Sequence, residues 1–349
     1  MLPSMFSGIS GLKVNQRKLD VIGNNIANSG TTAYKSQRAR FQDMVSQSMA
    51  SATGASANLG GTNPRQVGLG VQLAGIDTTT STGSMQPTSR PLDAAIDGPG
   101  YFIVGTGIPP EGSDSSNTDT GTIGIPDLAT HSMSSNGVTT SFTRDGSFTL
   151  DTQGSLLTSD GLRVYGYANS NVTIDYKEGK DNPKMPFKAT IDTDNGHGGA
   201  DTSISNDKLI PLIIPESVTI GDKISRVQSY AIGVDGTITA TLDTGGTAVL
   251  GQIAMASFKN DAGLTKMGKN LYQTSPNSGE PVVRSAAGDK DNDNSKGYGD
   301  MRQGMLEMSN VDLAEEFTNM IIANRAFQAN GKIITTGDEI LQDLVNLKR

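Results

Sequence analysis

The sequence predicts an α+β protein, with N- and C-terminal α-helices that form a coiled coil and a mainly antiparallel β middle of one or two domains. Apolar residues recur every seven positions at both ends of the 349-residue chain, which is coiled-coil spacing. Between the ends, strand-like segments alternate with turns rich in Gly and Asp, and the chain contains 42 glycines. Helices that are segregated from strands along a sequence are typical of an α+β fold.

These patterns divide the chain into three parts. We expect residues 1–30 and 309–349 to form a terminal helical coiled-coil domain, residues 31–75 an extended connector, and residues 76–308 one or two β-rich domains. Polar stretches near 105–140 and 168–208 are expected to be insertions in the β-rich part, because they are rich in Ser, Thr, Asp and Gly.

The opening helix carries one heptad line of apolar residues, which Ile9 and Ile22 widen. The residues of that line are Met5, Leu12, Leu19 and Ile26. The asparagines at positions 24, 25 and 28, together with Gly30, are expected to end this helix, since Asn and Gly are common at helix C-termini.

The closing helix gives the stronger pattern. Ser309-Asn310 is expected to supply the N-cap, and the acidic residues Asp312, Glu315 and Glu316 suit the positive end of the helix dipole. Its main seam consists of Leu313, Met320, Phe327, Ile334 and Leu341. The neighbouring seam is poorer in apolar residues and consists of Phe317, Asn324, Gly331, Asp338 and Val345. The basic Lys348 and Arg349 suit the negative end of the dipole.

Two narrow apolar stripes at opposite ends of one chain can pack on each other. A single pair would still expose apolar surface, so we expect the helices to pack also on copies from other chains. The alternative is an ordinary helical pair docked on the central domain. The predicted assembly residues are Met5, Leu12, Leu19, Ile22 and Ile26 in the opening helix and Leu313, Phe317, Met320, Phe327, Ile334 and Leu341 in the closing helix.

The connector between helix and β middle is polar. Its residues 38–49 are compatible with a helix, and Val67–Ile76 shows the alternation of a strand. In the middle, Asp97-Gly98 and Pro99-Gly100 predict a turn between two short strands, and Gly turns separate the strands of an antiparallel meander from Phe142 to Tyr167.

Composition excludes several classes of function. The chain has no Cys, so disulfides, thiol chemistry and Cys-ligated metals are excluded. The net charge is −8 and no basic patch with interleaved aromatics is present, which argues against nucleic acid. No apolar run is long enough for a membrane span, and the N-terminus lacks the pattern of a Sec-type signal peptide, so export would need another route.

Candidate catalytic and metal sites are weak, and no cofactor is expected. His131 and His197 lie in polar segments and are interpreted as exposed loop residues. The residues at 289, 291, 293 and 300 are aspartates, which match part of a calcium-loop template, but Asn294 replaces the expected Gly. A solvated acidic linker is therefore the preferred interpretation. A glycosidase-like carboxylate pair stays open, because a sequence does not show the distance between carboxylates.

Several motifs together resemble the bacterial flagellar rod and hook proteins. Leu19–Asn28 (LDVIGNNIAN), followed by Thr32–Lys35 (TAYK), resembles the N-terminal signature of that family. The run Ser309–Arg349 resembles the closing helix of its hook proteins. Motifs shared by the β domains are similar to AIDGPGYF at 95–102, TRDGSF at 143–148 and FKNDAGLTKMGKNLY at 258–272. In one departure, Ala33 stands where the family usually has Gly.

The resemblance implies a structural subunit of the flagellar hook. Such subunits leave the cell unfolded through the flagellar type III export apparatus and polymerise at the rod tip into a curved, flexible tube with a central channel. The tube acts as a universal joint that transmits torque from rod to filament. The implied partners are further copies of the chain, the distal rod protein, the hook cap and the hook–filament junction proteins, and the implied location is the extracellular hook. Neither catalysis, nucleic-acid binding nor membrane insertion is implied.

Three alternative functions stand beside the hook hypothesis. A distal rod subunit would form a rigid tube, and the length of the insertions is interpreted as favouring hook over rod. A secreted calcium-dependent binding module or adhesin with a coiled-coil stalk would need the acidic segment to bind metal. An enzyme has no positive feature in the sequence. The segment between Tyr167 and Tyr230 is too short for the large outer domain of longer hook proteins, so a reduced outer domain, or only a decorated β domain, is expected.

Overall fold

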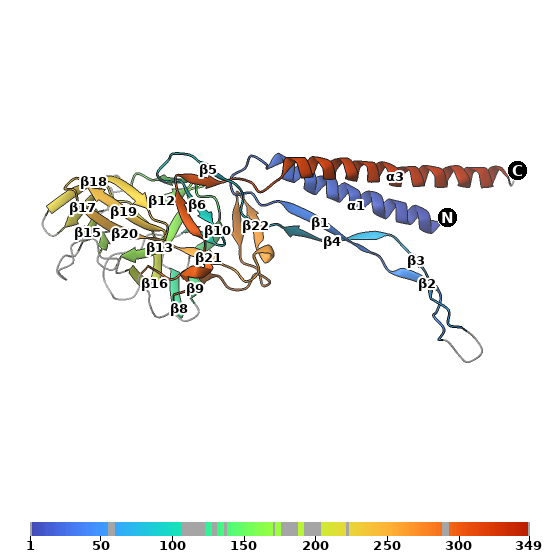
Figure 1. The fold of residues 1–349 in the computed structure, drawn as a ribbon, viewed down its shortest axis with the longest axis horizontal. Helices are drawn as coiled ribbons and strands as arrows, with labels where there is room; N and C mark the ends of the chain where they lie inside the picture. Colours follow the sequence, from blue (N-terminus) through green and yellow to red (C-terminus); the bar gives the residue numbers. More distant parts are fainter. Residues whose placement is uncertain are drawn as a thin grey trace. The chain divides into compact units, whose positions relative to one another are not determined.

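The computed structural model describes residues 2–54, 60–106, 123–127, 131–135, 138–169, 172–175, 188–191, 204–220, 223–287 and 293–347 (Figure 1). It separates into two compact units. Unit 1 comprises Met1–Ser81 and Ser309–Arg349, and unit 2 comprises Thr82–Met308. The predicted α+β class is confirmed, because helices occupy both ends of the chain and the strands between them pair almost entirely in antiparallel fashion.

Unit 1 contains the two long helices and a β-ribbon. Helix α1 (Leu2–Ala27) and helix α3 (Leu313–Asn346) lie side by side (Figure 1). Strands β1 (Gln37–Asp43) and β4 (Val71–Thr78) pair antiparallel, as do β2 (Ser46–Ala50) and β3 (Arg65–Gly68). The helix considered for residues 38–49 is therefore wrong. This segment is extended instead, and its backbone N–H and C=O groups are paired in a strand ladder with β4, which is rich in β-branched residues.

Helix α1 ends at Ala27. Of the residues expected to end it, Asn28 and Gly30 follow its last residue, whereas Asn24 and Asn25 lie within the helix and do not terminate it. The chain then turns, and Ala33 adopts a φ of 55° while it is almost fully buried. This left-handed conformation favours glycine, which is the residue expected at this position from the family pattern. The backbone at this position therefore keeps the conformation that suits Gly, although the residue is Ala.

A fully buried asparagine, Asn25, joins three elements of unit 1. Its side-chain nitrogen donates to the Gln37 carbonyl (2.8 Å) and to Glu316 Oε1 (2.7 Å) in α3. Its side-chain oxygen accepts from the Gln37 backbone N–H (3.0 Å) and from the Tyr34 hydroxyl (3.2 Å). These four bonds use the full capacity of an amide side chain. Asn25 therefore fixes β1 and α3 against α1 at one level.

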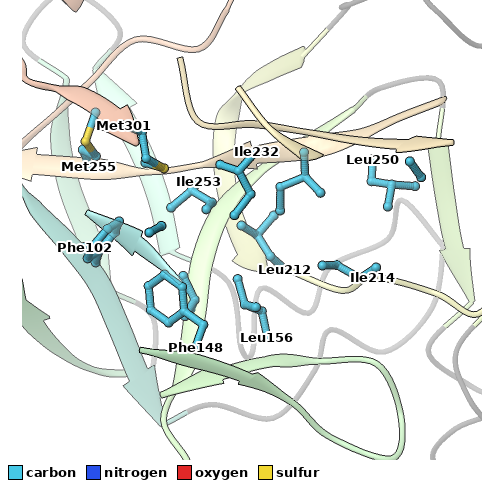
Figure 2. Close-up of a cluster of buried hydrophobic side chains, with 14 of the residues drawn as sticks. Phe102, Phe148, Leu156, Leu212, Ile214, Ile232, Leu250, Ile253, Met255 and Met301 are labelled. Carbon is cyan, nitrogen blue, oxygen red and sulfur yellow. The ribbon is translucent and has the colours of Figure 1, made fainter. Parts of the chain in front are cut away.

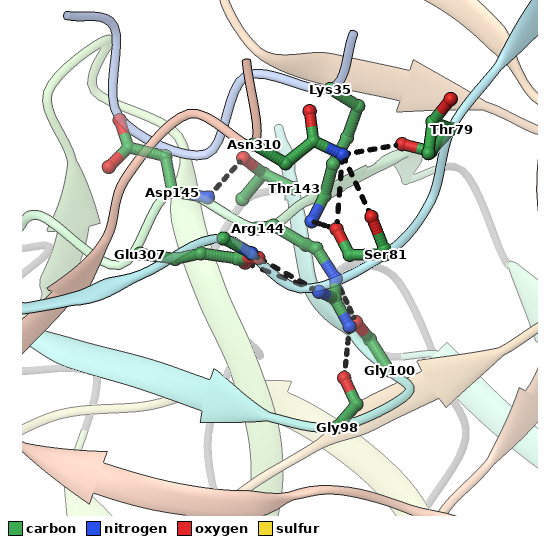
Figure 3. A network of polar contacts seen from close by, with 11 residues as sticks. Lys35, Thr79, Ser81, Gly98, Gly100, Thr143, Arg144, Asp145, Glu307 and Asn310 are labelled. Carbon is green, nitrogen blue, oxygen red and sulfur yellow. Dashed lines mark hydrogen bonds and ion pairs between the residues drawn. The ribbon is translucent and has the colours of Figure 1, made fainter. Parts of the chain in front are cut away.

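A second asparagine, Asn310, holds together the chain segments that precede and follow the β-ribbon (Figure 3). Its side-chain nitrogen donates to the Thr79 carbonyl (2.9 Å) and the Ser81 carbonyl (3.2 Å), and its oxygen accepts from the Ser36 N–H (2.7 Å). The buried Lys35 ammonium also donates to the Ser81 carbonyl (2.8 Å). Asn310 thus serves as a backbone cross-link rather than as the predicted N-cap of α3.

Unit 2 is built from short strands, most of them in one large, predominantly antiparallel sheet system. The one exception among the pairings of the described residues is the parallel pair β15–β17. The strands are β5 (Met85–Pro87), β6 (Ala94–Asp97), β7 (Tyr101–Thr106), β8 (Ile123–Asp127), β9 (Ser132–Ser135), β10 (Thr139–Thr143), β11 (Phe148–Leu150), β12 (Leu156–Thr158), β13 (Arg163–Asn169), β14 (Val172–Asp175), β15 (Lys188–Ile191), β16 (Ile204–Pro211), β17 (Ser217–Ile220), β18 (Lys223–Ile232), β19 (Thr237–Leu242), β20 (Thr247–Ile253), β21 (Met255–Ser257), β22 (Thr265–Gly268), β23 (Leu271–Gln273), β24 (Val282–Val283), β25 (Asp300–Gln303) and β26 (Met305–Glu307). Much of the two polar insertions near 105–140 and 168–208 lies outside the described residues.

Two buried apolar clusters form the core of unit 2. Figure 2 shows the first, in which Phe102 and Phe148 meet edge to face with ring centroids 5.1 Å apart. The cluster continues through Leu212, which follows β16, and through Ile253 of β20 and Met255 of β21. Such burial of aliphatic and aromatic side chains is the main favourable contribution to the folding of this unit.

A buried ion pair involves the last strand of unit 2. Arg144 Nη1 lies 3.2 Å from both carboxylate oxygens of Glu307 on β26 (Figure 3). The guanidinium also donates to the carbonyls of Gly98 and Gly100 and lies over the Tyr101 ring, 5.4 Å from its centroid. Burial raises the pKa of the Tyr101 hydroxyl, and Asp261 adds to this effect. Arg144 thus ties the predicted turn at 97–100 to the last strand.

Replacing Arg144 with Met is expected to lower the free energy of unfolding of unit 2 by about 3 kcal/mol or more, because it removes the cation from a buried carboxylate. The matched control is Arg226→Met, which removes an exposed pair with Glu216 (2.8 Å) and is expected to cost less than about 1 kcal/mol. Urea unfolding followed by the near-UV circular dichroism of the tyrosines measures both. Equal losses would contradict the assigned role of Arg144.

The change Asn25→Ala is expected to destabilise unit 1 by about 1–3 kcal/mol, since it leaves the Gln37 N–H and C=O without their side-chain partner. Asn24→Ala is the control, because Asn24 is exposed and its side chain makes no bond to β1 or α3 among the described residues: it donates to the Tyr34 hydroxyl (3.2 Å) and accepts from the Asn28 amide (3.0 Å). Thermal loss of the helical circular dichroism signal compares the two. A larger effect of Asn24→Ala would show that the buried amide does not fix the helices.

Candidate assembly interface

Helix α1 turns a stripe of small and aliphatic residues toward its neighbours in unit 1. The most buried members are Gly8, Gly11, Val14, Ile22 and Asn25. The predicted line of Met5, Leu12, Leu19 and Ile26 runs along the edge of this stripe and is half-buried. Ile9, which was expected to widen the stripe, is exposed. The heptad line therefore lies next to the centre of the contact and not on it.

Helix α3 presents only part of its predicted seam to α1. Met320, Ile334 and Leu341 are half-buried, whereas Leu313 and Phe327 are exposed. Phe317, taken from the poorer seam, is also exposed, and the rest of that seam is exposed except for the half-buried Gly331. The structure thus brings three of the six predicted α3 residues close to the helix–helix contact and leaves the other three facing outward.

The line that completes the contact on α3 was missed from the sequence because its residues are small or polar. It consists of Ala323, Asn330 and Gly337, spaced by seven. A Cβ placed on Gly8 would lie 3.4 Å from Ile334 Cγ1, and one on Gly11 would lie 2.7 Å from Asn330 Nδ2. The two helices therefore approach closely at glycines. Searching for small residues three positions after the apolar seam would have found this line.

Many large apolar side chains remain on the outside of the helix pair, on the sides that face away from the contact. They are Phe6 and Ile9 in α1, Leu313, Phe317, Ile321, Ile322, Phe327, Ile333, Ile340, Leu344 and Val345 in α3, and Leu347 at the C-cap of α3. Ile321 is 63% exposed and Phe327 is 39% exposed. Exposed apolar surface on this scale marks a site of protein–protein contact.

The start of α3 is acidic and is capped by Asp312. One Asp312 carboxylate oxygen accepts from the Ala314 N–H (2.8 Å) and the Glu315 N–H (3.3 Å), so the N-cap lies two residues later than predicted. Burial raises the pKa of Glu316, and its hydrogen bond from Asn25 opposes this rise. The Asn25 bond thus partly offsets the cost of burying a carboxylate between the helices. The basic residues Lys348 and Arg349 lie outside the described residues.

The structure also bears on the two histidines and on the candidate calcium loop. His131 is buried in unit 2, which corrects its interpretation as an exposed loop residue, and His197 lies outside the described residues. Two of the four template aspartates, Asp289 and Asp291, also lie outside them. Asp293 accepts from the Ser295 N–H (2.8 Å) and from the Ser285 hydroxyl (3.2 Å). Within the described ranges, no group of three or more acidic or histidine side chains could hold a metal ion.

The described helices are also not suited to crossing a bilayer. Over the described part of the chain, no helix combines the length and the apolar character that a membrane span requires.

Comparison with known protein families gives three matches that follow the order of the chain. "Flagella basal body rod protein" matches residues 5–35, "Flagellar hook protein FlgE/F/G D1 domain" matches residues 131–240, and "Flagellar basal body rod FlgEFG protein C-terminal" matches residues 302–347. The first and third matches cover most of α1 and α3, and the second lies within unit 2.

Three relatives align with the whole chain. The flagellar basal-body rod protein FlgG of Bacillus subtilis is 41% identical over 349 residues, covering 100% of both chains. The flagellar hook protein FlgE of Borreliella burgdorferi is 31% identical over 451 residues, again covering 100% of both. The FlgG rod protein of the same organism is 29% identical over 351 residues, with the same coverage. Since both proteins named as rod subunits match this chain in length, the inference that length favours hook over rod is wrong.

The end-to-end identity with these relatives and the three ordered family matches agree with the paired terminal helices and the antiparallel β middle. The chain therefore belongs to the family of bacterial flagellar hook and rod axial proteins.

Proposed function

We propose that this chain is a non-catalytic structural subunit of the flagellar hook, which polymerises through its terminal helices into a curved, flexible tube that links rod to filament. One observation carries the polymerising role: α1 and α3 approach each other closely at glycines, and a dozen large apolar side chains, counting Leu347 at the C-cap of α3, stay exposed outside that contact. Burying such a side chain contributes roughly 1.5–3 kcal/mol to stability. The isolated helix pair therefore lacks the stabilisation that burial of its exposed apolar side chains would give. Contact with further copies would supply it.

The predicted assembly residues fit this proposal in two groups. Ile22, Met320, Ile334 and Leu341 serve the contact between α1 and α3 within one subunit, together with the half-buried Met5, Leu12, Leu19 and Ile26. Leu313, Phe317 and Phe327 are exposed and serve contacts between subunits. In a heterologous interface that does not close on itself, such contacts generate an open helical polymer, as a tube requires.

The proposed partners and location follow from membership of the family. The chain would contact the distal rod protein, the hook cap and the hook–filament junction proteins, and would be exported through the flagellar type III apparatus without a cleaved Sec signal. The helical domain of 1–30 and 309–349 would form the inner tube around the export channel. The β-rich part would form the outer layer, and the connector of 31–75 would join them.

The distal rod is a second candidate, and a specific observation favours it. The protein that is 41% identical over the full length is named a rod subunit, and the hook protein compared with it is 31% identical over a longer alignment. What supports hook is the resemblance of residues 309–349 to the closing helix of hook proteins. Electron microscopy of the full-length chain, concentrated under salting-out conditions and with a hook–basal body seed, separates the two. Curved tubes support hook, straight tubes support rod, and monodisperse particles even on the seed contradict both.

Replacing Phe327 or Leu19 with Asp is expected to abolish tube formation while unit 2 stays folded. An uncompensated charge on an apolar seam costs several kcal/mol, well above the effect of a surface substitution. The matched control is Gln328→Asp, which places the same charge on a neighbouring exposed position. Electron microscopy scores the tubes, and tyrosine near-UV circular dichroism reports on unit 2. A Phe327→Asp chain that assembles like the unmodified protein would show that this seam is not needed for assembly.

A further inference from the structure

Helix α3 carries two separate apolar strips in addition to its contact with α1. The leading strip, near the start of the helix, consists of Leu313, Phe317 and Ile321. The trailing strip, in the second half, consists of Ile333, Ile340 and Leu344. At 3.6 residues per turn, the centres of the two strips lie roughly 160° apart around the helix axis. They therefore face nearly opposite directions, and one neighbouring helix is not able to cover both.

The leading strip protrudes. Its residues are spaced by four, so their side chains form one ridge along the helix. Phe317 is 51% exposed and Ile321, one turn further on, is more exposed still. The polar side chains on either side of Phe317 are engaged elsewhere: Glu316 accepts from Asn25 of α1 (2.7 Å) and Thr318 donates to the Ala314 carbonyl (2.8 Å). Nothing among the described residues of unit 1 covers the ridge.

The trailing strip borders a groove. The groove has a volume of about 490 Å³ and is lined by Ser4 of α1 and by Ala329, Lys332, Ile333, Thr336, Gly337 and Ile340 of α3. The lack of a side chain at Gly337 helps to open it, and a Cβ placed on Gly337 would lie 3.4 Å from Met5 Cγ. The groove is thus continuous with the contact between α1 and α3. Two isoleucines and the methyl-bearing Ala329 and Thr336 give it an apolar wall.

We propose that the leading strip of one copy docks into the trailing groove of a second copy. This inference rests on the proposed function and specifies which surfaces of neighbouring copies are in contact. A ridge of large apolar side chains and an apolar groove are complementary in shape and chemistry. They lie on opposite sides of one helix, so the contact is heterologous: each copy offers its ridge to one neighbour and its groove to another. Such a contact repeats without closing and has no need of a second kind of protein.

The proposal fixes the offset between neighbours. Copies related by rotation and translation along one tube axis keep their helices parallel. The strip centres, Phe317 and Ile340, are 23 positions apart in α3. At about 1.5 Å per residue, the two contacting helices are then displaced by roughly 35 Å along their length. In this register Ala314 faces the neighbourhood of Thr336 and Gly337, while Ile321 faces Leu344.

Disulfide cross-linking tests the contact directly, because the chain has no Cys of its own. Two single variants, Phe317→Cys and Ile340→Cys, are polymerised separately and as a 1:1 mixture, then oxidised and separated under denaturing conditions. The mixture is expected to give a disulfide-linked dimer, and each variant alone is expected to give several-fold less. The matched control replaces Ile340→Cys with Glu339→Cys, which lies at the same height on α3 but about 100° away from the groove.

A second pair of variants, Ala314→Cys with Thr336→Cys, keeps every large apolar side chain. It tests the same contact even where the first pair of variants does not assemble. Tubes that form without the mixed cross-link in either pair would overturn this proposal and leave the proposed function standing. Single variants that cross-link as well as the mixture would also overturn it, since they would indicate a two-fold contact. If neither tubes nor cross-links form on a hook–basal body seed, both proposals fail.

Discussion

The contact between α1 and α3 is close at its glycines and covers only one side of α3, and this limits what a single chain is able to bury. Gly8 and Gly11 face Ile334 and Asn330 at distances that leave no room for a Cβ at Gly11. A contact between two helices removes from water only the sides that face each other, and hydrophobic stabilisation scales with the buried apolar area. The exposed residues on the outer sides of α3 are the consequence. We regard the unit as incomplete by itself and completed by other copies.

A contact made of small residues does not fix helix register well, because a glycine or alanine fits several opposing positions. Polar side chains provide the register in unit 1. Asn25 uses all four of its hydrogen-bonding positions to hold Gln37, Glu316 and Tyr34, and Asn310 cross-links the segments at Ser36, Thr79 and Ser81. A buried polar residue that sets register at some cost in stability is well attested in coiled coils. Unit 2 instead depends on its apolar clusters and on the Arg144–Glu307 pair.

The sequence predicted the fold class and the existence of both helices, since heptad spacing and the alternation of strands and turns are local signals. It failed where a residue's role depends on distant partners. Asn25 was interpreted as a helix terminator because its partner Glu316 lies 291 positions away, and Arg144 was passed over because Glu307 lies 163 positions away. The small residues Ala323, Asn330 and Gly337 were missed because a search for apolar spacing does not detect them. The connector at 38–49 was assigned partly to helix because its strand pairing depends on β4.

The central claim is that the terminal helices are completed only by neighbouring subunits. Amide hydrogen exchange, compared residue by residue between the dilute monomer and the assembled tube, tests it most directly, because exchange reports local opening free energies. Amides of α1 and α3 are expected to exchange rapidly in the monomer and to become strongly protected in the tube, while the core strands of unit 2 are equally protected in both. Helices that are already as protected in the monomer as in the tube would contradict it.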